Sequence, residues 1–306
     1  MRDAPIRFFN RYTGRAETEQ VYGEAWLRWI YGAPVGRLAL WAVARRAWFS
    51  RWYGWRMDRP ASRGKIAPFI AHYAIACDDF AKRPEDFASF NDFFYRTLRP
   101  DARPVDASPE AVVFPADARH LGFQNAAAID HVFVKGQRFD LPALLGDVAL
   151  ARRYAEGAIV LSRLCHVDYH RFHFPIAGVP SAGRLINGPL ESVNPIALRR
   201  RLAILWENKR VITRLETERL GTVLLIEVGA TNVGGIVQTF RPGASVAKGE
   251  EKGYFKFGGS STITLFEPGR VKLAQDLVEN SHHGRELYAR MGDRMATNDS
   301  PAGGRA

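Results

Sequence analysis

The chain has few cysteines and no long apolar run. Its 306 residues include two cysteines, Cys77 and Cys165, whose positions fit neither a disulfide framework nor a structural zinc site. We therefore expect both thiols to be reduced, and we predict no metal site. No stretch approaches the ~20 consecutive apolar residues of a membrane-spanning helix. Residues 1–15 lack the apolar core of a signal peptide, which predicts that the protein is not exported.

Basic charge and tryptophan are concentrated in the first fifth of the chain. The formal net charge is +11, and residues 1–63 hold twelve arginines against five acidic residues, with six of the seven tryptophans. A nucleic-acid surface would use arginine for phosphates and tryptophan for stacking, but no recognised module is present, so no nucleic acid is predicted. Two interpretations remain and are compatible: a helix that packs on the protein, and an amphipathic helix that lies in a membrane surface.

Apolar spacing predicts helices in the first third of the chain and strands after it. Residues 20–56 have helical periodicity broken at Gly32-Ala33-Pro34, and Ser89 begins a capping-box pattern for a short helix through residue 96. Asp140 and Asn194 are expected to cap two more short helices. Short β-like runs separated by turn signals are expected at residues 111–114, 131–134, 158–164, 169–174, 210–217, 222–228, 235–240 and 261–266.

The predicted fold class is α+β, with a predominantly antiparallel β body and minor helices that follow an N-terminal helical arm. Residues 1–100 are predicted to form this membrane-associating arm, and residues 101–291 the β-rich domain. The polar, small-residue stretch 292–306 is predicted to be a disordered tail.

Residues that could carry chemistry occur at three places in the β-rich part. Gly258-Gly259-Ser260 interrupts a strand pattern, which indicates a bulge or a close backbone approach; alone, a bulged strand with a solvent-facing serine is the simpler interpretation. His170 and His173 can serve one site only if the strand bulges or His170 lies in the turn before it. Asp117 ends an apolar run, where a carboxylate is often a turn residue. Together, Asp117, His173 and Ser260 supply an orienting carboxylate, a base and a latent nucleophile.

These motifs resemble those of the phosphatidylserine decarboxylases, in the subgroup with Gly-Gly-Ser at its self-processing site. Residues 248–261 resemble that site, and residues 168–173 resemble the family's Asp-Tyr-His-Arg-x-His segment. Pro115-Ala116-Asp117 resembles its Pro-Ala-Asp-Gly segment, with Ala118 in place of the usual Gly. Further resembling segments extend from near residue 8 to near residue 270: residues 12–24, 90–94, 187–190, 193–195, 207–211 and 228–234.

The resemblance implies a self-cleaving enzyme that decarboxylates phosphatidylserine to phosphatidylethanolamine and carbon dioxide. The cut would fall between Gly259 and Ser260 by attack of the Ser260 hydroxyl, and Ser260 would become the pyruvoyl group that serves as cofactor. The β-rich domain would then be the catalytic domain. His173, oriented by Asp117, is expected to be the base, and His170 is expected to return a proton after decarboxylation.

The resemblance also implies partners and a location. The two fragments are expected to stay together as a heterodimer, with further dimerisation left open. A bilayer substrate fits a peripheral location on the cytoplasmic side of the cell membrane, with contact through residues 20–56. Two alternatives from other classes remain: a serine hydrolase that uses Asp117, His173 and Ser260 in an unbroken chain, and a non-catalytic lipid-binding module.

Overall fold

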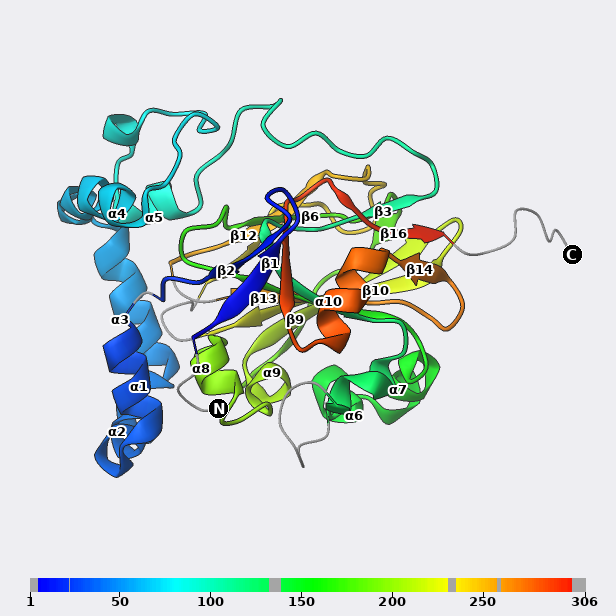
Figure 1. Ribbon diagram of the computed structural model, residues 1–306, viewed down its shortest axis with the longest axis horizontal. Coiled ribbons are helices and arrows are strands. Elements are labelled where there is room, and N and C mark those ends of the chain that lie inside the picture. The colour runs from blue at the N-terminus through cyan, green and yellow to red at the C-terminus, as the bar shows by residue number, and fades with distance from the viewer. Residues whose placement is uncertain (1–4, 22, 132–138, 231–234, 258–259, 299–306) are drawn as a thin grey trace, which may run out of the picture.

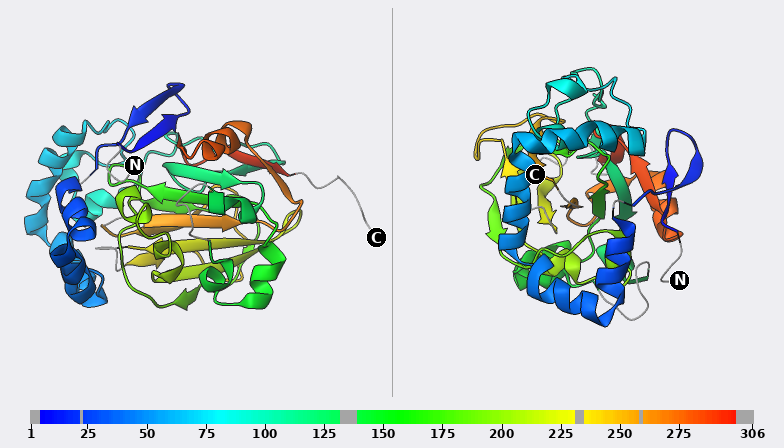
Figure 2. Two further views of the ribbon diagram at one scale, coloured as in Figure 1. Left: turned by 60° about the horizontal axis from the view of Figure 1, so that its bottom comes forward. Right: turned by 90° about the vertical axis from the view of Figure 1, so that its left-hand side faces the viewer.

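The computed structural model describes residues 5–21, 23–131, 139–230, 235–257 and 260–298. Helices of the first hundred residues gather at one end of the molecule, and the β body fills the rest (Figure 1). A view onto that end shows the helices surrounding the edge of the β body (Figure 2). The protein is therefore a mixed α+β structure with mostly antiparallel sheets, as the sequence predicts.

The main sheet of the described residues has ten strands in the order β2-β1-β15-β4-β5-β13-β10-β9-β7, with β8 also paired to β9. Only β1 and β15 pair in parallel, and the other described pairs of this sheet are antiparallel. The strands are β1 (Arg7–Asn10), β2 (Arg15–Thr18), β4 (Ala118–Phe123), β5 (Ile159–Leu164), β7 (Val179–Pro180), β8 (Arg184–Ile186), β9 (Arg210–Thr217), β10 (Gly221–Gly229), β13 (Ser260–Leu265) and β15 (Glu286–Ala289).

Two three-stranded antiparallel sheets flank the main sheet within the described residues. One has the order β11-β12-β6, and the other has the order β14-β16-β3. Their strands are β11 (Ile236–Gln238), β12 (Glu251–Phe255), β6 (Arg171–His173), β14 (Val271–Leu273), β16 (Arg294–Asn298) and β3 (Ala111–Val113). The register between β12 and β6 shifts between Glu251 and Gly253, so Lys252 occupies a bulge opposite the strand that carries His173.

The helices begin where the sequence places its caps. Pro34 opens the second helix, the Ser89 hydroxyl accepts from the Asp92 N–H, and the Asp140 and Asn194 side chains cap two short helices. The α-helices are α1 (Glu24–Gly32), α2 (Pro34–Ala39), α3 (Ala47–Asp58), α4 (Ile66–Tyr73), α5 (Phe90–Phe94), α6 (Leu141–Leu145), α7 (Val148–Tyr154), α8 (Pro195–Leu198), α9 (Ile204–Glu207) and α10 (Gln275–His282). A π-helical turn, Leu40–Ala44, and three 3-10 helices, Pro60–Lys65, Pro84–Asp86 and Ala126–His131, complete the set in the described residues. No described helix has both the length and the apolarity needed to cross a bilayer.

Alternate residues of the central strands enter two different apolar cores. In β10, Leu224 and Ile226 belong to one cluster, whereas Val223 and Leu225 belong to the other. Successive strand side chains point to opposite faces, so both faces of the sheet are covered. A third, aromatic cluster joins the N-terminal helices to Phe257 and contains Met57, Ile66, Phe69, Phe80, Phe87, Phe90, Phe93 and Phe94.

Three predictions about chain organisation need correction. Residues 7–18, predicted to belong to the helical arm, form the β1–β2 hairpin on the main sheet, because β1 pairs with distant β15. The predicted disordered tail is wrong for residues 294–298, which form β16 with Met295 and Ala296 buried. Both errors involve strands of four or five residues that long-range pairing stabilises. The strand expected at 131–134 is wrong at His131, which ends a 3-10 helix; residues 132–134 lie outside the described residues, as do residues 299–306.

Candidate active site

Ser260 is the first residue of β13, in the interior of the main sheet. It pairs with Leu164 of β5 on one side and with Gly229 of β10 on the other. Its side chain is 0% exposed, and its Oγ has no hydrogen-bond partner among the described residues. An unpaired buried hydroxyl costs about 1–3 kcal/mol, so a hydroxyl left unbonded here requires a reason. The interpretation of a solvent-facing serine is therefore wrong.

The segment just before Ser260 is held by the helical end of the molecule. Gly258 and Gly259, the predicted cleavage site, lie outside the described residues, but Phe257 is described. Its backbone N–H donates to Asn91 Oδ1 over 2.8 Å, and its ring contacts the rings of Phe90 and Phe94. Asn91 is fully buried, and its Nδ2 donates to Gly54 O and to an Asp58 carboxylate oxygen. The chain is thus fixed on both sides of the two glycines.

His173, the predicted base, is fixed in one tautomer on β6. Its Nδ1 lies 3.0 Å from Gly249 O, and because a carbonyl only accepts, Nδ1 carries the proton. Its Nε2 therefore has the lone pair and accepts from the Tyr169 hydroxyl at 3.2 Å. Burial lowers the pKa of His173, so the ring is neutral near neutral pH. An unprotonated Nε2 is the state that a general base requires.

Asp117 does not form the predicted hydrogen bond to His173. Its carboxylate accepts from Arg103 Nε at 2.9 and 3.0 Å and from Arg103 Nη2 at 2.7 Å, and it also accepts from the Met291 N–H. A buried carboxylate needs a cation, and the planar guanidinium takes both oxygens. Asp117 acts on His173 through its negative charge, which raises the pKa of that ring, whereas burial lowers it.

The backbone shows the conformation of Ala118 and the place of His170 relative to its strand. Ala118 begins β4, and it has no positive φ, so replacing the family's usual glycine does not strain the turn. His170 lies in the coil directly before β6, which is one of the two arrangements under which both histidines can serve one site. Sequence spacing thus correctly limited where His170 could lie.

His170 is enclosed more completely than His173. Its Nδ1 donates to Asp168 O at 2.9 Å, and its ring stacks on Phe94 with centroids 3.8 Å apart. Its Nε2 is buried and has no hydrogen-bond partner among the described residues. Burial holds the pKa of His170 well below its usual value, so the ring is neutral and Nε2 carries a lone pair. Ser260 Oγ and His170 Nε2 are thus buried without a hydrogen-bond partner among the described residues, as are Ser261 Oγ and Thr262 Oγ1 of β13.

An ion-pair network fixes the loop that links Leu164 to His170. Asp168 pairs with Arg119 and accepts from the Cys165 N–H at 2.6 Å. Arg119 also pairs with Glu19, which accepts in turn from Arg163. All of these charged side chains are buried, and buried charges persist only when paired. The network holds the histidine-bearing loop against β4 and β5.

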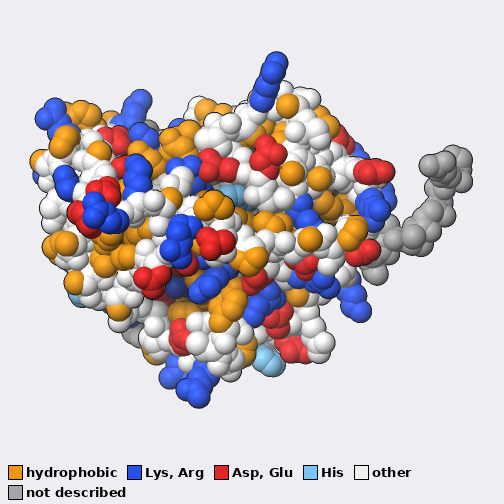
Figure 3. Space-filling model, turned by 90° about the horizontal axis from the view of Figure 1, so that it is seen from above, with side chains coloured by type: hydrophobic (Ala, Val, Ile, Leu, Met, Phe, Trp, Pro, Cys, Tyr) orange, Lys and Arg blue, Asp and Glu red, His pale blue; other side chains and the backbone are white. Residues whose placement is uncertain are grey.

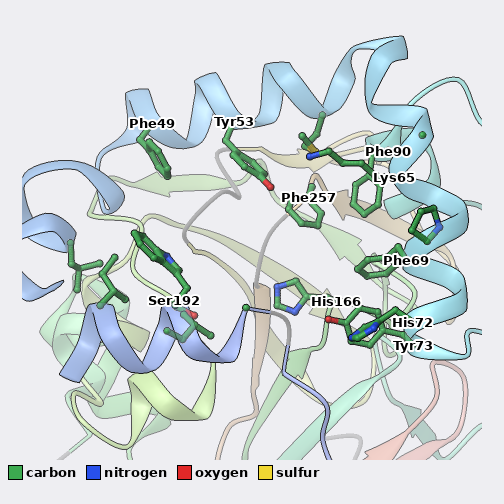
Figure 4. A pocket seen from close by; sticks show the side chains of 18 of the residues that line it. Phe49, Tyr53, Lys65, Phe69, His72, Tyr73, Phe90, His166, Ser192 and Phe257 are labelled. Carbon is green, nitrogen blue, oxygen red and sulfur yellow. The ribbon is translucent and has the colours of Figure 1, made fainter. Parts of the chain in front are cut away.

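A large cavity lies between the N-terminal helices and the β body. Its volume is about 900 Å³, and Figure 4 shows its walls. Phe49 and Tyr53 of α3 line one side, Phe69 and His72 of α4 line another, and His166 and Phe257 line the side toward the β body. The remaining lining residues are mainly apolar: Gly23, Trp26, Leu27, Ile30, Tyr31, Leu40, Met57, Gly64, Lys65, Pro68, Tyr73, Phe90 and Ser192. An amphipathic molecule fits such a lining.

Comparison with known proteins decides between the alternatives. Residues 90–297 match the family model of phosphatidylserine decarboxylase. A phosphatidylserine decarboxylase proenzyme of Fusobacterium nucleatum is 43% identical over 95% of this chain and 97% of its own length. Proteins of the same name from Chlamydia pneumoniae and Desulfitobacterium hafniense are 42% and 39% identical over 94% and 95% of this chain, and over 96% and 97% of their own lengths.

The chain belongs to the phosphatidylserine decarboxylase family. Membership makes it a carboxy-lyase that acts on phosphatidylserine, and it rules against the non-catalytic lipid-binding alternative. The relatives are named as proenzymes, which are precursors that need processing. The family model spans residues 90–297, so it includes Asp117, His170, His173 and Ser260.

The structure adds site residues that the sequence did not single out. Asn91 and Arg103 hold Phe257 and Asp117, and Tyr169 donates to His173. Asn91 stands within a segment that resembles the family, and Tyr169 lies between the two histidines, so both had a local signal. Arg103 had none, because a basic residue between two prolines looks like an ordinary surface loop.

Proposed function

We propose that the chain is a precursor that cuts itself between Gly259 and Ser260 and turns Ser260 into a pyruvoyl group. The observation that carries the proposal is the buried hydroxyl of Ser260, directly after two glycines, which has no hydrogen-bond partner in the part of the chain that the structure describes. A pyruvoyl group formed there supplies an electron sink for the electrons released as carbon dioxide leaves the substrate. Both the serine at position 260 and its burial fit a pyruvoyl group.

The first step is attack of Ser260 Oγ on the carbonyl carbon of Gly259, which converts an amide into an ester. A hydroxyl is a weak nucleophile and needs a base, and His173 Nε2 is held unprotonated for that role. General-base help of this kind is worth roughly 10²–10⁴-fold. Removal of the Ser260 α-proton then expels the ester oxygen, and hydrolysis with loss of ammonia leaves the ketone.

His170 is proposed to return a proton to the substrate after carbon dioxide leaves. Its Nε2 carries no proton in the observed tautomer and must take one up first. Asp117, held by Arg103, supports this region through its field rather than through a direct bond to His173. The serine hydrolase alternative is disfavoured because the family is that of a decarboxylase and the relatives are named as proenzymes, whereas a serine hydrolase would keep an unbroken chain.

The two fragments are proposed to remain together as a heterodimer after the cut. The small fragment begins with β13, which pairs over six residues with β5 and over six with β10, both from the large fragment. The strands β14, β15 and β16 also pair within sheets that contain large-fragment strands. Backbone ladders on both sides of β13 would have to break before the fragments could separate.

The protein is proposed to lie on the cytoplasmic side of the cell membrane and to contact it through residues 20–56. The tryptophans of this region are exposed, and the helical end shows hydrophobic and basic side chains side by side (Figure 3). In α3, Trp48, Trp52 and Trp55 form one exposed stripe, whereas Phe49 and Tyr53 line the cavity. Interfacial tryptophan with arginine near anionic lipid is typical of peripheral attachment.

Denaturing electrophoresis tests the self-cleavage. The purified chain should yield a fragment of roughly 5 kDa, estimated from its length. Its intact mass, measured by mass spectrometry, should be lower by one ammonia than the mass of the same fragment with an N-terminal serine. Ser260→Ala should remain one uncut, inactive chain, whereas Ser261→Ala, which removes the adjacent buried hydroxyl, should be cut. An active preparation with one continuous chain and an unmodified Ser260 would refute the proposal.

Vesicle sedimentation tests the membrane contact. Replacing Trp48, Trp52 and Trp55 together by alanine should reduce binding to vesicles that contain phosphatidylserine, and added salt should weaken binding further. Val148→Ala, which trims an exposed apolar side chain on α7, is the matched control and should bind like the parent. Equal binding of the parent and the triple variant would remove α3 from the proposed contact.

A further inference from the structure

His166 has a position that neither His170 nor His173 shares. It follows β5 by two residues, and Leu164 of that strand pairs with Ser260. Its ring lies 6.2 Å from that of Phe257, which precedes the two glycines of the cut. In Figure 4 it projects into the cavity from the side of the β body. His166 therefore lies on the part of the cavity wall that includes Phe257, which is two residues before Gly259 in the sequence.

The two histidines assigned to the reaction do not line this cavity. His170 is directed inward onto Phe94 and the Asp168 carbonyl, and His173 is bonded between Gly249 and Tyr169. His166 is half-buried, so a molecule in the cavity can reach it. Among the described residues of the β-body wall, it is the imidazole that a bound headgroup would meet.

The charge state of His166 suits a substrate that must lose a carboxylate. Burial lowers the pKa of His166 to about 4, against the opposing field of Glu19, so the ring is neutral near neutral pH. A cation paired with the carboxylate would stabilise the ground state more than the transition state, in which that charge leaves as carbon dioxide. A neutral imidazole can orient the headgroup by a hydrogen bond without that disadvantage.

The cavity also offers apolar side chains suited to acyl chains. Leu27 and Ile30 of α1, Leu40 of the π-helical turn and Phe49 of α3 are among its lining residues. In Figure 4, Lys65 and His72 stand on the α4 side, away from Phe49. A molecule with one polar and one apolar end can therefore lie with its polar end toward His166 and its acyl chains against these apolar side chains.

We propose that His166 contacts the headgroup of the phospholipid substrate and orients it for decarboxylation, while taking no part in the self-cleavage. This inference rests on the proposed function, because it assumes that the reacting group arises at Ser260. His166 is then a specificity-determining residue, and the cavity holds the acyl chains. A substitution of His166 should therefore impair the decarboxylation of lipid and leave the self-cleavage intact.

The test compares His166→Leu and His166→Gln with His283→Leu, which removes an exposed histidine at the end of α10. Each variant is examined for fragment formation, then for kcat and KM with phosphatidylserine in detergent micelles. His166→Leu should be cut like the parent, with kcat/KM lowered on the order of 10- to 100-fold, the loss expected for a hydrogen bond to a charged group. His166→Gln, which keeps a donor and an acceptor, should lose less, and His283→Leu should match the parent.

Two results would overturn the inference. One is a His166→Leu enzyme that is fully cut and retains the parent kcat/KM; the other is a His166→Leu chain that folds but remains uncut. If His166→Leu does not fold, as judged by its thermal transition, His166→Gln decides by the same two criteria. Failure of the proposed function would look different, because the parent chain itself would then show no fragments.

Discussion

The buried ion pair between Lys252 and Glu227 provides a sharp test of how the two sheets of the site are joined. Lys252 Nζ lies 2.8 Å from Glu227 Oε2, and the two residues are 1% exposed. Gln238 completes the group, because it bonds to both side chains. Lys252 comes from the bulge of β12 opposite His173, whereas Glu227 stands beside Thr262 in the ladder of β10 and β13. The pair therefore links the histidine-bearing sheet to the strand of Ser260.

Removing one partner leaves the other charge buried and unpaired. Lys252→Met or Glu227→Leu should each lower the free energy of unfolding by about 3–5 kcal/mol, a large part of the ~5–15 kcal/mol available to a typical domain. The double variant replaces both charges by apolar groups of similar size, which is often neutral. Gln238 is half-buried and can turn toward water, so it should not reverse this result. The double variant should thus be close to the parent in stability.

The measurement is denaturant unfolding in the Ser260→Ala background, where each sample is one uncut chain. Self-cleavage of the same variants with Ser260 restored gives a second measurement. The single variants should be cut more slowly, because β12 positions the strand that carries His173. The reasoning is refuted if the double variant loses as much stability as the two single variants together, since the loss would then come from packing rather than from unpaired charge.

Three further predictions concern other parts of the site. Asn91→Ala should slow the cut, because it removes the side-chain oxygen that accepts from the buried Phe257 N–H, and fragment formation over time would show this. Gly253→Ala should destabilise the Ser260→Ala precursor by about 1–3 kcal/mol in denaturant unfolding, because an added Cβ would lie 2.1 Å from Val237 O. Burial lowers the pKa of His120 in the folded chain to about 3. Below about pH 6.5, this histidine is therefore protonated in the unfolded chain but still neutral in the folded chain. Stability should therefore fall by about 2 kcal/mol from this residue between pH 7 and pH 5, and His120→Gln should show a shallower pH dependence.

Local sequence signals predicted those elements whose ends are set by their own residues. The helix Leu141–Leu145 begins after its Asp140 cap, and strand Arg210–Thr217 has the predicted bounds. Strands β1 and β16 were missed because each has only four or five residues and is stabilised by partners far along the chain. Patterns of that length do not distinguish a strand from a loop.

Some residues of the site were likewise indicated by a local motif, whereas others depend on contacts with distant parts of the chain. The motif singled out Ser260 but did not predict its burial, and spacing left two arrangements for His170, of which the structure has the one before the strand. The partner of Asp117 could not be predicted, because Arg103 reaches it from a loop whose path depends on the whole fold. His166 was not predicted from the sequence, since its contact with the cavity depends on helices more than ninety residues earlier.

The position of Ser260 at the start of a central strand meets two opposing demands. The proposed self-cleavage needs a backbone that can leave regular geometry, and two glycines stand in the sequence directly before Ser260, where the described ladder of β13 begins. The cut must also leave the new terminus in place, and the ladders to β5 and β10 hold β13 from its first residue. Phe257, bonded to Asn91 and lining the cavity, fixes the other side. Under the proposed mechanism the bond would break between these two anchors, so both new chain ends would stay held after the cut.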